Sequence, residues 1–123
     1  MIKVLLVDDS AIVRKAIKTI LNRHPEIQVI GECKDGEEVI PFLQHQKPDV
    51  ILMDSNMPVL NGIEATKLVN HLFPEIKVIG LSCHDDIVTK NAFFENGAVG
   101  FLSKYETTNE KLVLKINNCC LIM

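Results

Sequence analysis

The chain has 123 residues, enough for one domain with a buried core and too few for two domains of ordinary size, so we expect a single domain over residues 1–123. An apolar content of 47% favours a packed globule over a disordered chain. The net charge of −3 leaves no surplus of basic groups to neutralise a phosphate backbone. Direct binding of nucleic acid is therefore not expected.

The sequence also bears on the cellular compartment. No apolar run approaches the length of a membrane span, and Met1–Lys3 leads directly into a short strand instead of a signal peptide. Cys33, Cys83, Cys119 and Cys120 show no Cys-x-x-Cys spacing, so we interpret them as reduced thiols, with Cys33 and Cys83 as small core residues. We expect a cytoplasmic protein that does not bind membranes.

Five apolar runs of strand length alternate with segments of helical periodicity. The runs are Ile2–Val7, Ile27–Gly31, Val50–Met53, Val78–Leu81 and Val99–Leu102. Regular alternation implies right-handed crossovers and a parallel sheet with helices on both faces. The sequence therefore predicts a doubly wound α/β domain with a five-stranded parallel sheet and five helices.

The helices are predicted from apolar stripes and from residues that start or stop a helix. The first should run from Ser10 or Ala11 to about Asn22, before Pro25. The second should open at Gly36–Glu38 and carry Pro41 in its first turns, where the missing amide costs least. The other three are expected at Ile63–Leu72, at Ile87–Glu95 with Asn96–Gly97 as its stop, and from Asn109 to about Asn118.

Polar residues follow four of the predicted strands. Asp8 and Asp9 follow the first, Asp54 the third, Ser82 the fourth, and Lys104 comes shortly after the fifth. Taken singly, each has an ordinary explanation as a helix cap, a turn residue or a solvated lysine, and for Asp9 capping and metal binding are equally plausible. In a parallel sheet, however, all of them reach the same edge, where α/β proteins bind their ligands. This convergence indicates a functional site.

The acidic residues of this edge suggest a metal site. Asp8, Asp9 and Asp54 would form a group of hard oxygen ligands, and a small divalent ion would hold such like charges together. Mg²⁺ suits the group, because it binds one or two carboxylates and keeps water or substrate oxygens in its other positions. A backbone carbonyl of the loop after Asp54, that of Asn56, is a further candidate ligand.

Beside a metal ion, Asp54 is a candidate nucleophile that accepts a phosphoryl group. Lys104 would supply a compact positive charge for the phosphoryl oxygens, and Ser82 a hydroxyl donor. We expect His84, two residues after Ser82, to have no more than a tuning role.

At this point the sequence resembles the receiver domain of bacterial two-component response regulators, and the resemblance covers nearly the whole chain. A receiver domain has the flavodoxin-like form of the fold predicted above. The segments that carry the resemblance are Val4–Ser10, Asp49–Pro58, Asn61–Thr66, Leu81–Ser82 and Gly97–Lys104, in this order and at compatible spacing. Within the family, Val29–Glu32, Phe73–Ile79 and Gly97–Lys104 look most like receivers attached to a LuxR-type helix-turn-helix output domain.

The resemblance implies a role for each matching residue. Asp54 would be the phosphoacceptor, Asp9 a direct Mg²⁺ ligand, Asp8 a ligand acting through water, and the Asn56 carbonyl the third protein ligand. Two further positions complete the set: Ser82 would be the switch hydroxyl, and Lys104 the phosphate partner. Phe101 occupies the position of the family's switch aromatic, although a partly buried strand residue would look the same in sequence.

Two departures from the family pattern are relevant. Tyr105 follows the lysine where the family often has proline, which leaves the shape of the loop before the last helix open. Cys83 stands beside the switch hydroxyl where a smaller residue is usual, which leaves the lifetime of the phosphoryl group open. No output domain follows the fifth predicted helix, so both a fragment of a transcription regulator and a free-standing receiver agree with the sequence.

The leading hypothesis is a signalling switch that receives a phosphoryl group from a histidine kinase or phosphotransfer protein and forms a homodimer on phosphorylation. It would not be an enzyme beyond its own phosphorylation and dephosphorylation. One alternative is an aspartate-nucleophile phosphatase, but Asn56 occupies the position where such enzymes usually carry a second Asp. The other alternative is a receiver-like module that works by binding alone.

Overall fold

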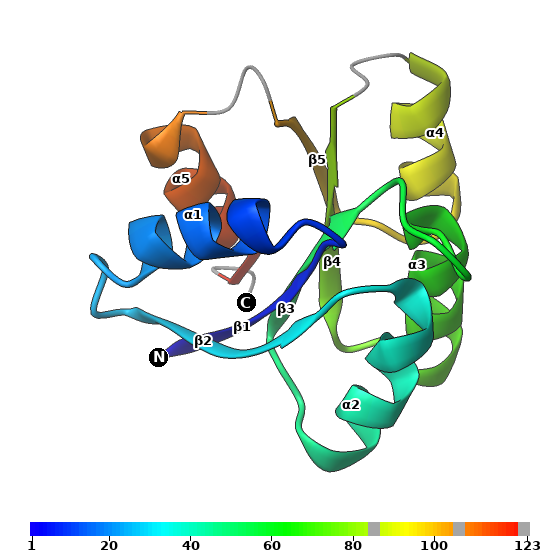
Figure 1. Cartoon of the computed structure of the whole chain (residues 1–123), viewed down its shortest axis with the longest axis horizontal. Coiled ribbons are helices and arrows are strands. Elements are labelled where there is room, and N and C mark those ends of the chain that lie inside the picture. Colours follow the sequence, from blue (N-terminus) through cyan, green and yellow to red (C-terminus); the bar gives the residue numbers. More distant parts are fainter. Residues whose placement is uncertain (84–86, 105–107, 121–123) are drawn as a thin grey trace.

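The computed structural model describes residues 1–83, 87–104 and 108–120. In these residues strands and helices alternate along the chain (Figure 1). The elements are β1 (Ile2–Val7), α1 (Ala11–Leu21), β2 (Ile27–Cys33), a short 3₁₀ helix η1 (Gly36–Glu38), α2 (Val39–His45), β3 (Val50–Asp54), α3 (Gly62–Leu72), β4 (Lys77–Ser82), α4 (Ile87–Glu95), β5 (Gly100–Ser103) and α5 (Asn109–Cys120).

The five strands form one parallel sheet in the order β2-β1-β3-β4-β5. β1 is paired with β2 on one side and with β3 on the other. The chain that leaves β1 therefore crosses in the opposite direction from the chain that leaves β3. In an open α/β sheet this reversal creates a crevice at the carboxyl ends of the two strands, which is where such folds bind ligands. The predicted fold class is confirmed.

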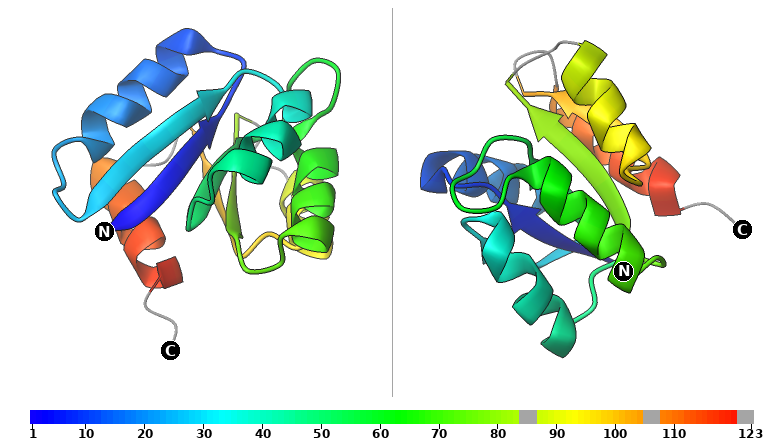
Figure 2. Two further views of the ribbon diagram at one scale, coloured as in Figure 1. Left: turned by 90° about the horizontal axis from the view of Figure 1, so that it is seen from below. Right: turned by 90° about the vertical axis from the view of Figure 1, so that its right-hand side faces the viewer.

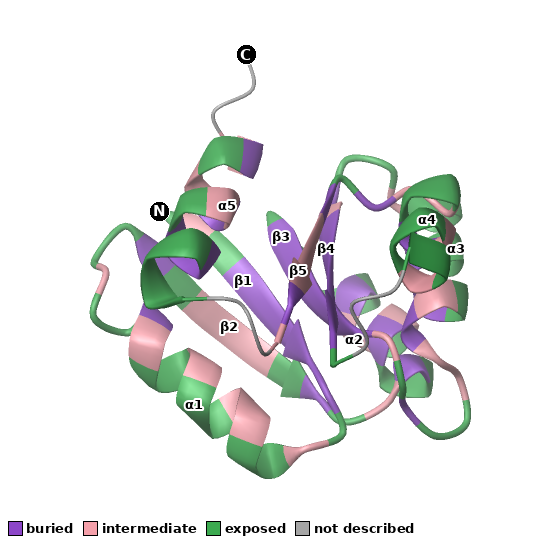
Figure 3. Ribbon diagram, turned by 90° about the horizontal axis from the view of Figure 1, so that it is seen from above, coloured by how far each residue is buried: buried purple, intermediate pink, exposed green. Residues whose placement is uncertain are grey.

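The helices cover both faces of the sheet. Figures 1 and 2 show α1 and α5 on one face and α2, α3 and α4 on the other. Side chains alternate along β1, so Leu5 and Val7 belong to the core under α2, α3 and α4, whereas Val4 and Leu6 belong to the core under α1 and α5. Figure 3 shows the inner strands buried and the outward sides of the helices exposed.

The element bounds differ from the predicted ones mainly at the ends. β5 begins at Gly100 and includes Ser103, one residue later than predicted at both ends. The second helix starts as 3₁₀ turns at Gly36, because Asp35 caps Glu38 through its carboxylate, and it becomes α-helical only at Val39. Ser10, not Asp9, is the N-cap of α1, and its hydroxyl accepts a hydrogen bond from the N–H of Val13 at 3.3 Å.

Two further sequence-based expectations concern Cys83 and membrane spans. Cys33 is buried as predicted, but the prediction that Cys83 is a core residue is wrong: Cys83 is exposed. It follows the last residue of β4, so it has left the sheet whose alternation would have turned it inward. In the described part of the chain, no helix combines the length and the apolar character of a membrane span.

Two glycines are required beside α3 and α4. Gly97 ends the α4 segment, as predicted, with a φ of 105° that other residues rarely adopt. At Gly62, the first residue of α3, a Cβ atom would collide with the carbonyl oxygen of Asp54. The N–H of Gly62 also donates to the carbonyl of Ser55 at 3.2 Å. Gly62 therefore allows the start of α3 to lie directly against the end of β3.

Candidate functional site

An acidic cluster lies at the carboxyl ends of β1 and β3. Val7 is paired with Met53, so the residues that follow, Asp8 and Asp54, emerge side by side. Both are buried, with 3% and 4% of their surface exposed, whereas Asp9 is exposed. Carboxylate oxygens of these three residues lie within 4.8 Å of one another. The structure thus brings together the three acids that the sequence predicted at one edge.

Lys104 adds a positive charge to this cluster. Its Nζ lies 2.5 Å from Oδ2 of Asp8 and 3.0 Å from Oδ1 of Asp54. The backbone positions it, because Lys104 follows β5 directly and its N–H donates to the carbonyl of Ser82 at 2.8 Å. One ammonium group therefore bridges two buried carboxylates from two neighbouring strands.

The buried charges influence each other's protonation. Burial raises the pKa of Asp54, and the nearby Asp8 charge raises it further, while the hydrogen bond from Lys104 lowers it. Burial by itself would lower the pKa of Lys104, but hydrogen bonds to Asp8 and Asp54 outweigh this effect and raise it. The lysine is therefore held in its charged form, and it offsets part of the cost of two buried carboxylates.

The donor set fits a magnesium ion. Three carboxylates with oxygens this close are hard ligands, and exposed Asp9 leaves the site open to water, which Mg²⁺ retains. Asp8 is already partly engaged, since its Oδ1 accepts a hydrogen bond from the N–H of Ser10 at 2.9 Å. Asp8, Asp9 and Asp54 are the residues that would hold the ion.

The loop after β3 borders the cluster. The backbone N–H of Asn56 hydrogen-bonds to the Asp54 carboxylate and lowers the pKa of that group. Residue Asn56 is exposed, and its backbone carbonyl stays a candidate metal ligand, as predicted from the sequence. Val59, in the same loop, has a φ of 70° in the left-handed region, which is unfavourable for a β-branched residue. The loop is thus a strained turn beside the phosphoacceptor candidate.

Ser82, at the end of β4, is fully buried. Its Oγ accepts a hydrogen bond from the hydroxyl of Ser55 at 2.9 Å. Ser55 is the residue directly after Asp54, and its own N–H donates to the carbonyl of Leu81 at 3.0 Å. The predicted switch hydroxyl therefore lies next to the strand of Asp54 and is engaged by the neighbour of the predicted phosphoacceptor.

Phe101 is partly buried on β5 and packs against the core under α2, α3 and α4. Its ring lies 5.8 Å from that of Phe93 in α4, at 48° between the ring planes. Gly80 leaves room for Phe93, since a Cβ atom at Gly80 would collide with the Phe93 ring. A movement of the Phe101 side chain would therefore change the packing of α4, because the Phe101 ring contacts the Phe93 ring.

The sequence interpretation missed two residues of this region. Ser55 contacts Ser82, and its only sequence signal is its place directly after Asp54. Arg14 of α1 donates from Nη1 to the carbonyl of Asp8 at 2.5 Å and from Nε to Glu32 at 3.0 Å, and nothing in the sequence marks it. His84 and Tyr105, which the sequence analysis singled out, lie outside the described residues.

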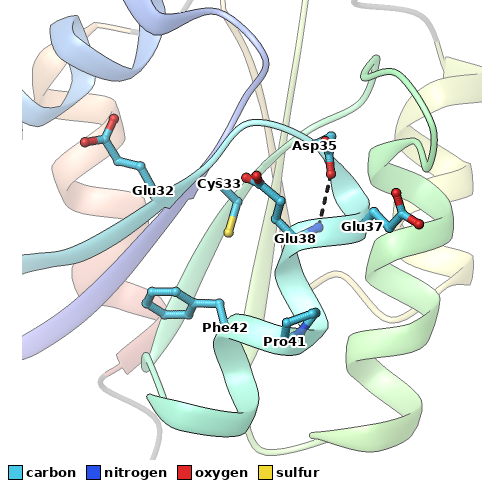
Figure 4. Close-up of a pocket in the computed structure, with 7 residues that line it drawn as sticks. All are labelled: Glu32, Cys33, Asp35, Glu37, Glu38, Pro41 and Phe42. Atoms are coloured by element: carbon cyan, nitrogen blue, oxygen red, sulfur yellow. Dashed lines mark hydrogen bonds between the residues drawn. The ribbon is translucent and has the colours of Figure 1, made fainter.

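A separate hollow of about 580 Å³ lies beside β2 and α2 (Figure 4). It is lined by Glu32, Cys33, Asp35, Glu37, Glu38, Pro41 and Phe42. None of the predicted site residues lines it, and its carboxylates would repel a phosphoryl group. The site residues predicted from the sequence therefore lie at the edge formed by β1, β3, β4 and β5, and not in this hollow.

Comparison with known proteins finds relatives that share part of their sequence with this chain. The DegU transcriptional regulatory protein of Brevibacillus brevis is 40% identical over 103 residues, which are 84% of this chain and 44% of DegU. A protein-glutamate methylesterase/protein-glutamine glutaminase of Thermotoga maritima is 45% identical over 105 residues, which are 84% of this chain and 30% of that protein. The chain thus spans less than half the length of these relatives.

Solved structures show the same fold. The response regulator domain of Thermotoga maritima CheB superposes with a TM-score of 0.91 at 35% identity, covering 100% of this chain and 98% of that one. The receiver domain of the response regulator NarL from Mycobacterium tuberculosis gives 0.90 at 27% identity, covering 96% and 94%.

The relatives include a regulator of transcription and an enzyme, and this chain matches only a part of each of these longer proteins. The response regulator receiver domain family matches residues 4–117. The chain therefore belongs to the response regulator receiver domain family of two-component signalling.

Proposed function

We propose that residues 1–123 act as one receiver domain that is switched by phosphorylation of Asp54 in a Mg²⁺-dependent reaction. The observation that carries this proposal is the bridge of Lys104 between the buried carboxylates of Asp8 and Asp54. Such a bridge places a fixed positive charge where a phosphoryl group on Asp54 would concentrate negative charge.

In the proposed reaction an oxygen of the Asp54 carboxylate attacks the phosphorus of the donor. A new P–O bond forms, the bond to the donor's leaving group breaks, and the leaving group keeps the electron pair. Lys104 would move from Asp54 Oδ1 to a phosphoryl oxygen, and Ser82 would donate its hydroxyl to another. When bound at Asp8, Asp9 and Asp54, Mg²⁺ supplies charge neutralisation for the phosphoryl oxygens.

The proposed donor is a sensor histidine kinase or a phosphotransfer protein, and the family to which the chain belongs supports this class of partner. We place the exchange in the cytoplasm. The cysteines Cys33, Cys83, Cys119 and Cys120 are all free thiols, which suits a reducing compartment.

Acetyl phosphate with Mg²⁺, followed by intact-protein mass spectrometry, tests the proposal. We expect one added phosphoryl group in the wild-type chain and none in Asp54→Asn. Asp49→Asn is a matched control, because Asp49 precedes the same strand at its other end, where its carboxylate accepts from the N–H of Lys3 at 2.8 Å. Undiminished labelling of Asp54→Asn would refute the assignment of the phosphoacceptor.

The labelling experiment, together with an assay of phosphoester hydrolysis, separates the alternatives. A wild-type chain that takes up no phosphoryl group under any Mg²⁺ concentration would point to a module that works by binding alone. Steady hydrolysis of unrelated small phosphoesters would point to a phosphatase. The proposed switch predicts neither result.

We propose that the phosphoryl group signals through Phe101. Inward movement of the Ser82 hydroxyl would vacate space for the Phe101 ring, and the contact of that ring with Phe93 would pass the change to α4. Beryllofluoride with Mg²⁺, a phosphoryl mimic, should shift amide resonances around Asp54 and also across 87–95 and 101–112. It should also favour a homodimer through this face, which size-exclusion chromatography with light scattering would detect. Shifts confined to the acidic cluster would indicate a phosphoryl carrier instead.

A further inference from the structure

The Ser55 hydroxyl is the feature from which a further inference can be drawn. It donates to Oγ of Ser82 at 2.9 Å, and Ser82 is fully buried. Ser55 is held in place by its backbone at two points, because its N–H donates to Leu81 and its carbonyl accepts from Gly62. The hydrogen bond therefore joins two hydroxyl groups whose backbones are both held in place, that of Ser55 by two hydrogen bonds and that of Ser82 by strand β4.

The Ser55–Ser82 hydrogen bond lies on the face of the sheet that α4 covers. Val78 belongs to the core under α2, α3 and α4, and Gly80 faces the Phe93 ring of α4 on the same side. Since side chains alternate along a strand, Ser82 shares that side with Val78 and Gly80. Leu52, two residues before Asp54, belongs to the opposite core, under α1 and α5. Ser55 thus engages Ser82 on the α4 side of the sheet, away from the face that leads to the Asp54 carboxylate.

We propose that Ser55 is a positioning residue that retains the Ser82 hydroxyl on the α4 side while Asp54 is unmodified. This inference rests on the proposed function, because it concerns how readily the phosphorylated arrangement forms. A phosphoryl group on Asp54 has to draw Ser82 away from Ser55, so the strength of the Ser55–Ser82 bond sets part of the balance between the two arrangements. Loss of the Ser55 hydroxyl removes that competition and favours the switched arrangement.

The test compares Ser55→Ala with Ser55→Thr, which keeps a hydroxyl. Beryllofluoride with Mg²⁺ is titrated into each protein and followed by amide shifts. A single neutral hydrogen bond predicts apparent binding about two- to tenfold tighter in Ser55→Ala, and near-wild-type binding in Ser55→Thr. In a Ser82→Ala background, Ser55→Ala should have no further effect, because the bond is already absent.

A second measurement needs no ligand. In metal-free protein, the amide resonances of Phe101 and Leu102 in Ser55→Ala should move part of the way along the line that joins the free and beryllofluoride-bound wild type. A thermal melt of each variant shows whether the fold is retained, and a merely structural role for Ser55 would change the melt without this directed shift.

The experiment distinguishes a failure of the proposed function from a failure of the inference about Ser55. If wild type itself fails to bind beryllofluoride, the proposed function fails. If wild type binds and Ser55→Ala binds equally or more weakly with unmoved Phe101 resonances, only the inference about Ser55 is overturned. An equal effect of Ser55→Ala with and without the Ser82 hydroxyl would also overturn it.

Discussion

Replacing Lys104 by methionine removes the ammonium group that bridges Asp8 and Asp54, at 2.5 and 3.0 Å from their oxygens. The methionine preserves most of the apolar stem, so the change is mainly one of charge. The lysine side chain is only 14% exposed and the two carboxylates 4% and 6%, so water screens these pairs weakly. We expect a marked loss in the free energy of unfolding of the metal-free protein.

The magnitude has an upper bound, because a carboxylate left without its cation takes up a proton. From the ordinary Asp pKa of 3.8, protonating one carboxyl costs at most about 5 kcal/mol at about pH 7.5 and about 1.6 kcal/mol at about pH 5. Breaking a buried ion pair by removing one partner typically costs about 3–5 kcal/mol, which is within the bound at the higher pH. We therefore expect about 3–5 kcal/mol at about pH 7.5 and less than about 2 kcal/mol at about pH 5.

The sign of the pH dependence follows from the Asp54 carboxyl. Burial already raises its pKa in the folded protein, and the Lys104 hydrogen bond opposes that rise. Without Lys104 the folded pKa rises further above the unfolded one. A raised carboxyl pKa means that the folded state binds more protons, so the stability is present at low pH and is lost as pH rises through the folded pKa.

Urea unfolding followed by circular dichroism, with chelator present, measures this loss at both pH values. Lys111→Met is the matched control, since Lys111 is exposed on α5 and should cost little. In an Asp54→Asn background the Lys104→Met substitution should cost less, because one of its two partners is already neutral. A cost below about 1 kcal/mol at about pH 7.5, or equal costs at both pH values, would refute the electrostatic reasoning.

Three further predictions concern the metal, the loop and a thiol. Asp9→Ala should abolish most Mg²⁺ binding in a calorimetric titration and leave the fold intact, because Asp9 is exposed and its loss removes one of three carboxylates that repel one another in the metal-free protein; unchanged binding would place the metal elsewhere. Val59→Gly should raise the free energy of urea unfolding by roughly 0.5–1 kcal/mol, because glycine accepts the φ of 70°; a loss would show that the loop needs the valine side chain. At about pH 8, iodoacetamide should label exposed Cys83 but not Cys33, since burial and the nearby acids Glu38 and Asp35 raise the pKa of Cys33 to about 12. Equal labelling by peptide mass spectrometry would contradict that assignment.

The sequence by itself determined the alternation of strands and helices and the edge at which Asp8, Asp9 and Asp54 converge. These follow from local rules: apolar runs of strand length, helical stripes, and the shared direction of parallel strands. The end of the α4 segment at Gly97 could also be predicted, because a residue in the left-handed conformation after a helix is usually glycine. The switch roles of Ser82 and Phe101 came from resemblance to the family, and they stay predictions.

Tertiary structure alone decided which groups touch. No sequence rule states that Lys104 bridges Asp54 and Asp8, which is 96 positions away from the lysine, or that Ser55 donates to Ser82. The error at Cys83 has the same origin, because the end of a strand is set by pairing with its neighbours and not by the apolar run itself. Side-chain contacts across a sheet depend on register and on distances of a few ångströms, and these are fixed only when all strands and helices pack together.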